Sequence, residues 1–237
     1  MFWTMGLTQE IIMLIGLEQL MIAMIDQAQA LHRLMAWIRD EHLHMLDWYE
    51  REGLLNLNNR NGCVGSGGVA YTDELPQADR QDGGPVRTMD LWGFGESQET
   101  VGVSPAMFGE FVFPYQLPLL SRFGLNAYGC CEPVHQRWSY IRQIPRLRRV
   151  SVSPWCDQPR MAELMGGDYI FSRKPNPAHV CVGFNEPAIR EDLRGTLAAA
   201  GKLPLEIILK DTHTVQNRPD RITRWVRIAR EEIDRAC

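Results

Sequence analysis

The stretch LNAYGCCEPVHQRWSYIRQIPRLRRVSVS, residues 125–153, decides how the chain is expected to fold. It opens with the apolar run Leu125–Cys130, continues with helical spacing over Val134–Gln143 and closes with a second apolar run, Leu147–Ser153. Short apolar runs separated by a helix are typical of two parallel strands joined by a crossover. The stretch therefore predicts a parallel β-sheet that is covered by helices.

The same alternation continues on both sides of this stretch. Before it we expect a doubtful strand over Thr88–Gly93 and a helix over Pro105–Phe123, with Ser104 as its N-cap. After it the pattern predicts a helix at Gln158–Met165, a strand at Asp168–Ser172, a helix at Glu186–Ala200, a strand at Leu205–Leu209 and a helix at Pro219–Arg235. Repeated strand-helix units indicate the α/β class.

The beginning of the chain follows a different pattern. Leu and Met recur at helical spacing over residues 1–50, with a break near Asp26. A short strand is predicted at Leu54–Asn58, and a glycine-rich loop follows it to about Gly84. Loops of this length are often functional.

The number of strands favours a (β/α)8 fold of the TIM-barrel type that is incomplete at its N-terminus. Five strands are clear and a sixth is doubtful, whereas a closed barrel needs eight. Because the chain opens in a helix, the missing strands are expected before Met1. An open doubly wound sheet needs no missing strands and is the structural alternative. In either case we expect residues 1–237 to form one domain, partial if it is a barrel.

Composition and charge narrow the function classes. A content of 45% hydrophobic and 23% charged residues is that of a globular protein, and a net charge of −4 gives no general attraction to nucleic acid or anionic lipid. The apolar run Ile11–Ile25 is short and contains Glu18, so it predicts neither a membrane span nor a signal peptide. We expect a cytoplasmic protein that acts on a small molecule. Six cysteines are too few for a disulfide framework, which leaves their thiols as candidate ligands or nucleophiles.

Polar residues just past the strand ends are expected at one rim of the sheet, where such folds carry their sites. They include the glycine-rich loop after the first predicted strand and Lys210, Asp211 and His213 after the last. Cys130, Cys131 and Glu132 include the thiol groups that zinc prefers, although a pair of buried thiols without function is an equally good interpretation. Since neighbouring residues of a strand point to opposite faces, only one of the two cysteines should face the rim. His213, after the last strand, is a candidate acid-base group or ligand, while a solvated loop histidine is the commoner case.

Several separated motifs together resemble the uroporphyrinogen decarboxylase-like superfamily. Met89–Gly93 is similar to the family's Phe-Asp-Ser-Trp strand end, and Val103–Tyr115 to its Leu-Ser-Pro…Pro-Tyr helix. Lys174–Pro177 is similar to its Gly-Asn-x-Asp-Pro turn. The resemblance runs from Gly16 to about His213 and implies the later part of a family barrel.

The corrinoid methyltransferases of this superfamily provide the leading functional expectation. Tyr128-Gly129-Cys130 resembles their zinc-binding His-x-Cys strand end with tyrosine in place of histidine, and His213 falls where their last zinc-binding cysteine lies. The resemblance implies Zn²⁺ held by Cys130 or Cys131 with Glu132 and His213. That zinc would activate a thiol or another methyl acceptor opposite a methylated corrinoid carried on a separate protein. The residues implied are His213, Asp90 and Glu132 for catalysis and Trp92, Trp155, Lys174 and Asn176 for cofactor binding.

Two alternatives remain beside methyl transfer. Missing strands would expose backbone edges and core, so the chain could be a truncated, non-catalytic barrel that serves as a binding partner, and the same exposure would favour a homo-oligomer. Alternatively, His213 falls where the family's decarboxylases carry Gly-His-Gly, which implies metal-independent decarboxylation with His213 as proton donor. The decarboxylases' N-terminal Arg-rich motif and first-strand Asp would lie before Met1, which argues against that reaction.

Overall fold

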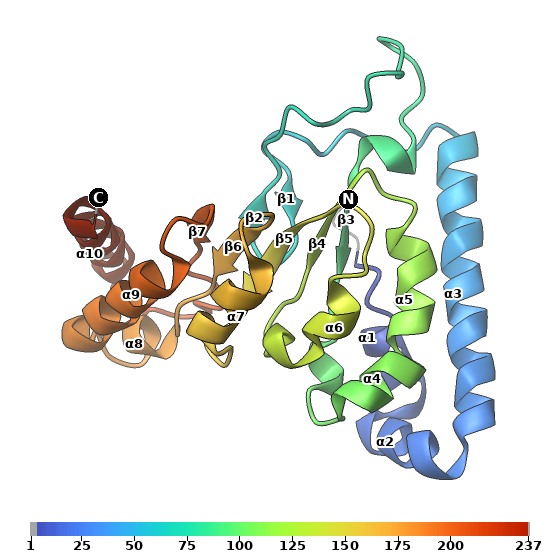
Figure 1. The fold of residues 1–237 in the computed structure, drawn as a ribbon, viewed down its shortest axis with the longest axis horizontal. Helices are drawn as coiled ribbons and strands as arrows, with labels where there is room; N and C mark the ends of the chain where they lie inside the picture. The colour runs from blue at the N-terminus through green and yellow to red at the C-terminus, as the bar shows by residue number, and fades with distance from the viewer. Residues whose placement is uncertain (1–3, 237) are drawn as a thin grey trace.

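The computed structural model describes residues 4–236, and a five-stranded parallel sheet lies at its centre (Figure 1). The strands follow one another across the sheet in chain order: β3 (Trp92–Gly95), β4 (Leu125–Tyr128), β5 (Leu147–Val152), β6 (Ile170–Arg173) and β7 (Leu205–Ile207). Parallel strands in sequential order, joined by right-handed crossovers, place their helices on one face. A doubly wound sheet reverses its strand order, so that alternative is wrong for the part of the chain described.

The sheet is open, and its first edge is capped by side-chain and backbone groups. Strands β3 and β7 are the outer strands, and no strand within residues 4–236 joins them. The α/β class is confirmed, and closure into an eight-stranded barrel stays a prediction. Asn58 donates from Nδ2 to the Trp92 carbonyl at 3.0 Å and accepts from the Trp92 N–H at 2.9 Å, while Met5 N–H donates to the Phe94 carbonyl at 2.7 Å. These bonds occupy backbone groups that an uncapped edge would leave unpaired.

The strand predicted at Leu54–Asn58 is wrong. These residues form an irregular segment beside β3. The Asn58 side chain binds the backbone of Trp92 in β3, in place of the backbone hydrogen bonds that a strand would make. Asparagine disfavours strands because its amide competes for backbone hydrogen bonds, and this segment contains two asparagines, Asn56 and Asn58. The doubtful strand is real but begins later, as β3 at Trp92.

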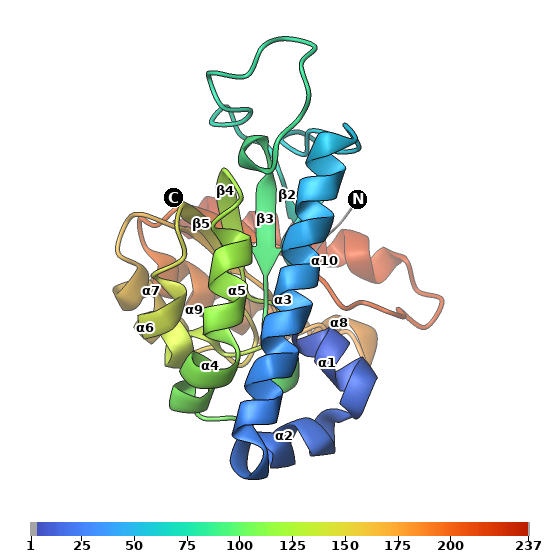
Figure 2. The same cartoon turned by 90° about the vertical axis from the view of Figure 1, so that its right-hand side faces the viewer.

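Three helices form the N-terminal part: α1 (Thr8–Ile15), α2 (Leu17–Asp26) and α3 (Ala28–Arg51). The predicted break at Asp26 is confirmed, and a second break falls at Gly16, whose φ of 85° suits glycine. Figure 2 shows α3 running alongside a shorter helix, α5 (Phe113–Leu120), in front of β3. Within residues 4–236, no single helix combines the length and apolarity needed to cross a membrane; the bent pair α1 and α2, at 97° to each other, meets that requirement by length and composition.

The helix predicted over Pro105–Phe123 is divided into α4 (Pro105–Phe111) and α5. Pro114 has no N–H to donate to the carbonyl four residues earlier, so the chain bends at Val112. The predicted N-cap is confirmed, because the Ser104 hydroxyl accepts from the Met107 N–H at 3.2 Å. The other helices are α6 (Trp138–Ile141), α7 (Gln158–Met165), α8 (Ala178–Cys181), α9 (Glu186–Ala200) and α10 (Asp220–Ala236).

The two faces of the sheet are covered by different parts of the chain. Tyr128, Val150 and Phe171 point into the core under the helices. On the opposite face Trp92, Phe94, Leu125 and Ala127 pack against Val64, Ala70 and Leu75 from the glycine-rich loop. Alternate residues of each strand thus serve opposite faces, as the pleat of a strand requires. The loop is a cover for the face that helices leave open.

The covering loop contains a small antiparallel hairpin of β1 (Cys63–Val64) and β2 (Gly68–Val69). Arg149 on β5 binds this hairpin to the sheet: it donates to the Val69 carbonyl at 2.6 Å and to the Val64 carbonyl at 3.3 Å. The guanidinium approaches so closely that a Cβ on Gly68 would lie 2.8 Å from its central carbon. A larger residue at this position would force the Arg149 guanidinium to shift from its contacts with the hairpin.

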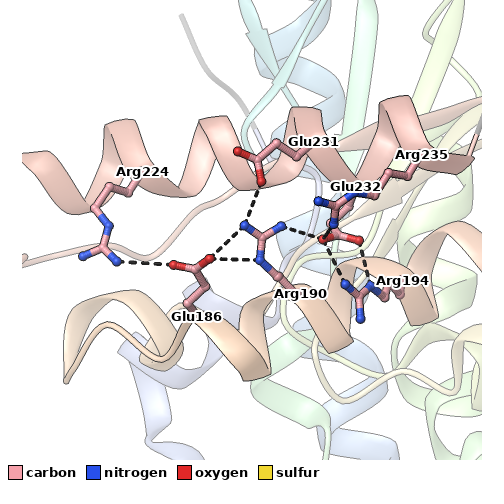
Figure 3. A network of polar contacts seen from close by, with 7 residues as sticks. All are labelled: Glu186, Arg190, Arg194, Arg224, Glu231, Glu232 and Arg235. Atoms are coloured by element: carbon pink, nitrogen blue, oxygen red, sulfur yellow. Dashed lines mark hydrogen bonds and ion pairs between the residues drawn. The ribbon is translucent and has the colours of Figure 1, made fainter.

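A charged network joins α9 and α10 at the C-terminal end of the chain (Figure 3). Arg190 of α9 contacts Glu186, Glu231 and Glu232, and Arg194 also reaches Glu232. Hydrogen bonds from Arg194 and Arg190 lower the pKa of Glu232 to about 2. The stabilisation that this carboxylate provides is therefore complete above its ordinary pKa of 4.5 and is lost progressively as the pH falls from that value through about 2.

Candidate active site

The carboxyl ends of β4 and β7 bring a thiol and an ammonium group together. Nζ of Lys210, past the end of β7, lies 3.2 Å from Sγ of Cys130, which follows β4. The same ammonium donates to Oγ of Ser66 at 2.8 Å, and the Ser66 hydroxyl lies 3.5 Å from the Cys130 sulfur. Ser66 comes from the turn of the covering hairpin, so three distant segments meet at one sulfur atom.

This environment favours the thiolate form of Cys130. Hydrogen bonds from the Cys131 thiol, Ser66 and Lys210, together with the charge of Lys210, lower the pKa of Cys130 to about 5, although burial opposes the change. The contact with Cys130 and burial raise the pKa of Cys131 above its usual range. At neutral pH the pair therefore consists of one thiolate and one thiol. A low-pKa, partly exposed thiolate beside a lysine is the arrangement found in reactive cysteines.

The four residues predicted as zinc ligands do not form a zinc site. Both oxygens of the Glu132 carboxylate are used as backbone acceptors, from the Ser97 N–H and the Cys130 N–H, each at 2.8 Å. His213 is exposed, and across residues 4–236 no three His, Cys, Asp or Glu side chains are grouped closely enough to hold a metal. The Lys210 ammonium, 3.2 Å from one sulfur and 3.8 Å from the other, occupies the position that a cation between the sulfurs would take. The residues present do not fit zinc.

Both cysteines face the rim, so the prediction that only one would do so is wrong. The argument assumed strand geometry, but β4 ends at Tyr128 and Gly129 has a φ of 96°. The chain therefore leaves the pleat before Cys130. As a result the sulfurs of Cys130 and Cys131 lie 3.8 Å apart.

Two predicted residues lie at the other end of the sheet. Asp90 precedes β3 and is fully buried, where it accepts hydrogen bonds from Arg87 and from the Gln77 N–H. Trp92 begins β3 and donates from its indole to the Ala70 carbonyl at 3.1 Å, beneath the covering loop. Since Cys130 follows the carboxyl end of β4, neither residue reaches it. Their contacts are those of structural residues.

The other predicted cofactor-binding residues differ in their surroundings. Trp155 is 69% exposed, and the Asn176 side chain accepts from the nearby Ala178 N–H at 3.0 Å. Lys174 is buried on the face of the sheet that the glycine-rich loop covers, and its Nζ donates to the Ser172 carbonyl at 3.1 Å. Burial lowers the pKa of Lys174 to about 7. Of these residues only Lys174 lies on the face that carries Cys130 and Arg149.

A buried pair of carboxyl groups lies behind the thiols. Glu96 follows β3 and is 3% exposed, and Oε2 of Glu96 accepts from the Gln98 N–H at 3.0 Å. Burial and the neighbouring carboxyl groups of Glu132 and Glu99 raise the pKa of Glu96 to about 9. Burial also raises the pKa of Glu132. Glu96 therefore carries a proton at neutral pH.

The site uses two residues to which the sequence analysis gave no role: Lys210, which was expected at the rim, and Ser66 of the glycine-rich loop. The rim position predicted for Lys210 from its place after the last strand is confirmed, since its Nζ lies 3.2 Å from the Cys130 sulfur. The glycine-rich loop was expected at the rim, but no local pattern singled out Ser66, since its contact with Lys210 joins residues 144 positions apart.

Comparisons of this chain with family models, with curated proteins and with solved structures found no match. The resemblance to the decarboxylase-like superfamily therefore stays a prediction.

Proposed function

We propose that this protein is a transferase that uses the Cys130 thiolate as its nucleophile toward an electrophilic carbon of a small-molecule substrate. The observation that carries the proposal is the 3.2 Å contact between the Lys210 ammonium and the Cys130 sulfur. Activated nucleophiles in enzymes are characteristically paired with a group that lowers their pKa. Cys130 is only partly buried, so a substrate can reach it.

The residues present account for both halves of such a displacement. The Cys130 sulfur forms a bond to the substrate carbon, and the bond from that carbon to the leaving group breaks. The leaving group departs with the bonding electron pair and takes a proton from the Lys210 ammonium. Ser66 donates to the sulfur in the resting state and keeps it aligned with Lys210.

The group transferred is proposed to be methyl, and this part depends on the resemblance. A corrinoid on a separate protein would supply the methyl group to the Cys130 sulfur. A small-molecule thiol would then return a proton to Lys210 and attack the methyl carbon; its new S–C bond would form, the bond between that carbon and the Cys130 sulfur would break, and Cys130 would leave as the thiolate. The thiolate at the predicted rim supports this version. This version of the reaction uses no zinc ion, because the Lys210 ammonium lies where a zinc ion between the two sulfurs would have to be.

The reactivity of Cys130 with iodoacetamide tests the nucleophile. We expect the alkylation rate of Cys130 to rise with pH around a midpoint of about 5. At pH 6 the larger thiolate fraction, offset by the weaker nucleophilicity of a low-pKa thiolate, should make Cys130 react about tenfold faster than an ordinary thiol. Peptide mapping by mass spectrometry identifies the labelled residue.

Two variants and one internal control accompany this measurement. Lys210→Met should shift the midpoint of Cys130 upward toward that of a free cysteine, and Cys130→Ser should abolish the fast labelling. Cys156 should stay unlabelled, since it is buried and burial raises its pKa to about 11. A midpoint near 8–9 for Cys130 in the parent protein, the value of an unperturbed thiol, would remove the proposal.

Methylcobalamin with a small thiol acceptor tests the methyl version separately. We expect the parent protein to remove the cobalt-bound methyl group, followed by the change in visible absorbance, and Cys130→Ser to be inactive. His213→Ala should keep the activity, because no contact connects exposed His213 with Cys130 within the described residues. An inactive parent with a reactive Cys130 would contradict methyl transfer and leave other electrophilic carbons as substrates.

The non-catalytic alternative has one observation in its favour. Met13, Leu14, Trp37 and Trp48 expose apolar side chains along a groove of about 710 Å³ between α1 and α3. Apolar patches of this kind often mark sites of protein association. A parent protein that fails the alkylation test and self-associates would favour this alternative.

A further inference from the structure

The two adjacent thiols have complementary surroundings. The Cys130 sulfur is approached by the donors Ser66 and Lys210, whereas Cys131 lies with its thiol 3.9 Å from the Asp211 carboxylate, an acceptor. Their sulfurs are 3.8 Å apart, and both side chains are partly exposed. An electron-rich sulfur thus lies next to a protonated thiol at a position that solutes can reach.

We propose that Cys130 and Cys131 are a redox site, which a hydroperoxide oxidises to a disulfide between the adjacent residues and which thereby switches off the Cys130 nucleophile. The inference rests on the proposed role of Cys130. It adds a function for Cys131 beyond its hydrogen bond to the Cys130 sulfur.

The oxidation proceeds in two steps. The Cys130 sulfur attacks the hydroperoxide, an S–O bond forms, the O–O bond breaks, and the departing alkoxide takes a proton from the Lys210 ammonium. Cys130 is then a sulfenic acid. The Cys131 sulfur attacks the Cys130 sulfur, the S–S bond forms, the S–O bond breaks, and hydroxide leaves with the Cys131 proton as water. Two thiol groups lose two electrons in total, and the hydroperoxide is reduced to an alcohol and water.

The short backbone between the two residues makes the product easy to reduce. Adjacent Cα atoms are about 3.8 Å apart, whereas disulfides usually span about 4.4–6.8 Å between Cα atoms. The disulfide ring is therefore strained, and strained disulfides are the labile and regulatory ones. The two sulfurs are 3.8 Å apart at present. The usual S–S bond length is about 2 Å, so they must approach each other by a little under ~2 Å. The irregular chain after β4 allows that movement, since these residues are outside the strand.

The test oxidises the full chain with a modest excess of tert-butyl hydroperoxide. In the parent we expect the mass to fall by two hydrogens, a disulfide within the peptide that contains residues 130 and 131, and complete loss of iodoacetamide labelling at Cys130. Dithiothreitol should restore the labelling. Cys131→Ser removes the thiol that would close the disulfide, and the labelling rate of this variant before oxidation is the reference for its own later loss. After oxidation Cys131→Ser should react with dimedone as a sulfenic acid, and with more peroxide it should lose labelling irreversibly.

Cys63→Ser is the matched control, because Cys63 is an exposed cysteine that is not part of the pair. It should behave as the parent does. The inference is overturned if the parent gains oxygen without the internal disulfide, or if the disulfide formed requires Cys63. Rapid alkylation at pH 6 combined with either result would reject the redox site alone. Slow alkylation with the disulfide still formed would reject the proposed nucleophile and keep the redox site.

Discussion

Arg149→Met is expected to lower the free energy of unfolding by about 3–5 kcal/mol, the cost typical of breaking a buried ion pair from one side. Arg149 is 5% exposed, and its Nε lies 2.7 Å from Oε1 of Glu206, at ion-pair distance without the alignment of a hydrogen bond. Its guanidinium also lies 5.1 Å from the centre of the Trp92 ring. Chemical denaturation of parent and variant measures the difference.

The adjacent residue provides the control for this prediction. Arg148 lies on the same strand but is half-buried at the surface, where it pairs with Glu74, and exposed pairs of this kind contribute about 0–1 kcal/mol. Arg148→Met should therefore change stability little. The double variant Arg149→Met, Glu206→Leu should recover much of the loss, because it leaves no unpaired carboxylate. Equal effects of Arg148→Met and Arg149→Met would contradict the role assigned to Arg149.

Arg149→Met should also change the chemistry of Cys130. The hairpin is held to β5 by the two carbonyl contacts of Arg149, and it carries Ser66 to the sulfur. The Arg149→Met, Glu206→Leu variant should consequently keep its fold but show a higher midpoint for alkylation of Cys130. This separates the contribution of the hairpin from that of Lys210.

Glu96→Gln is expected to stabilise the protein by about 1–3 kcal/mol at pH 7. The pKa of Glu96 is raised to about 9, above the ordinary value near 4.5 that applies in the unfolded chain. Below pH 4.5 the carboxyl group is protonated in both states and costs nothing. As the pH rises from 4.5 to 9, the unfolded chain releases this proton and the folded protein does not, so folding becomes less favourable. Glutamine has no proton to release and escapes this cost.

Unfolding measured at several pH values distinguishes this effect from a simple packing gain. The advantage of Glu96→Gln should be absent at pH 4 and should grow as the pH is raised toward 9. Glu163→Gln is the control, since Glu163 is exposed and pairs only with its neighbour Arg160 on α7 among the contacts described. A constant advantage across the pH range would show that the raised pKa of Glu96 is not its cause.

The elements predicted best are those whose signals are local. Helices α7 and α9 begin and end as predicted, because Asp157 and Asn185 cap them through hydrogen bonds to backbone N–H groups and proline occupies the first turn. Strands β4 to β7 were placed by their apolar runs. The strand predicted at Leu54–Asn58 does not form, because its asparagines oppose the strand that its apolar alternation favours. The hairpin of β1 and β2 has no recognisable sequence pattern, because its strands are two residues long.

The residues of the candidate site also differ in whether a local signal predicts them. Cys130 was predicted from its position after a strand, a local property that the structure retains. The zinc set depended on four residues converging, and Glu132 and His213 do not, because the Glu132 carboxylate satisfies backbone N–H groups and the loop after β7 leaves His213 in solvent. Ser66 and Arg149 act through contacts across more than 60 positions, which no local pattern encodes.

The hairpin also has a consequence for the order of events during folding. The hairpin lies in the first third of the sequence, yet it is bound by Arg149 and Lys210 from much later positions. These contacts close loops of 85 and 144 residues. Closing long loops is entropically costly and is usually deferred until the intervening elements have formed. Cys130 should accordingly behave as an ordinary thiol while the sheet assembles and acquire its acidity when the hairpin docks. The appearance of fast alkylation during refolding would then time the last step of assembly.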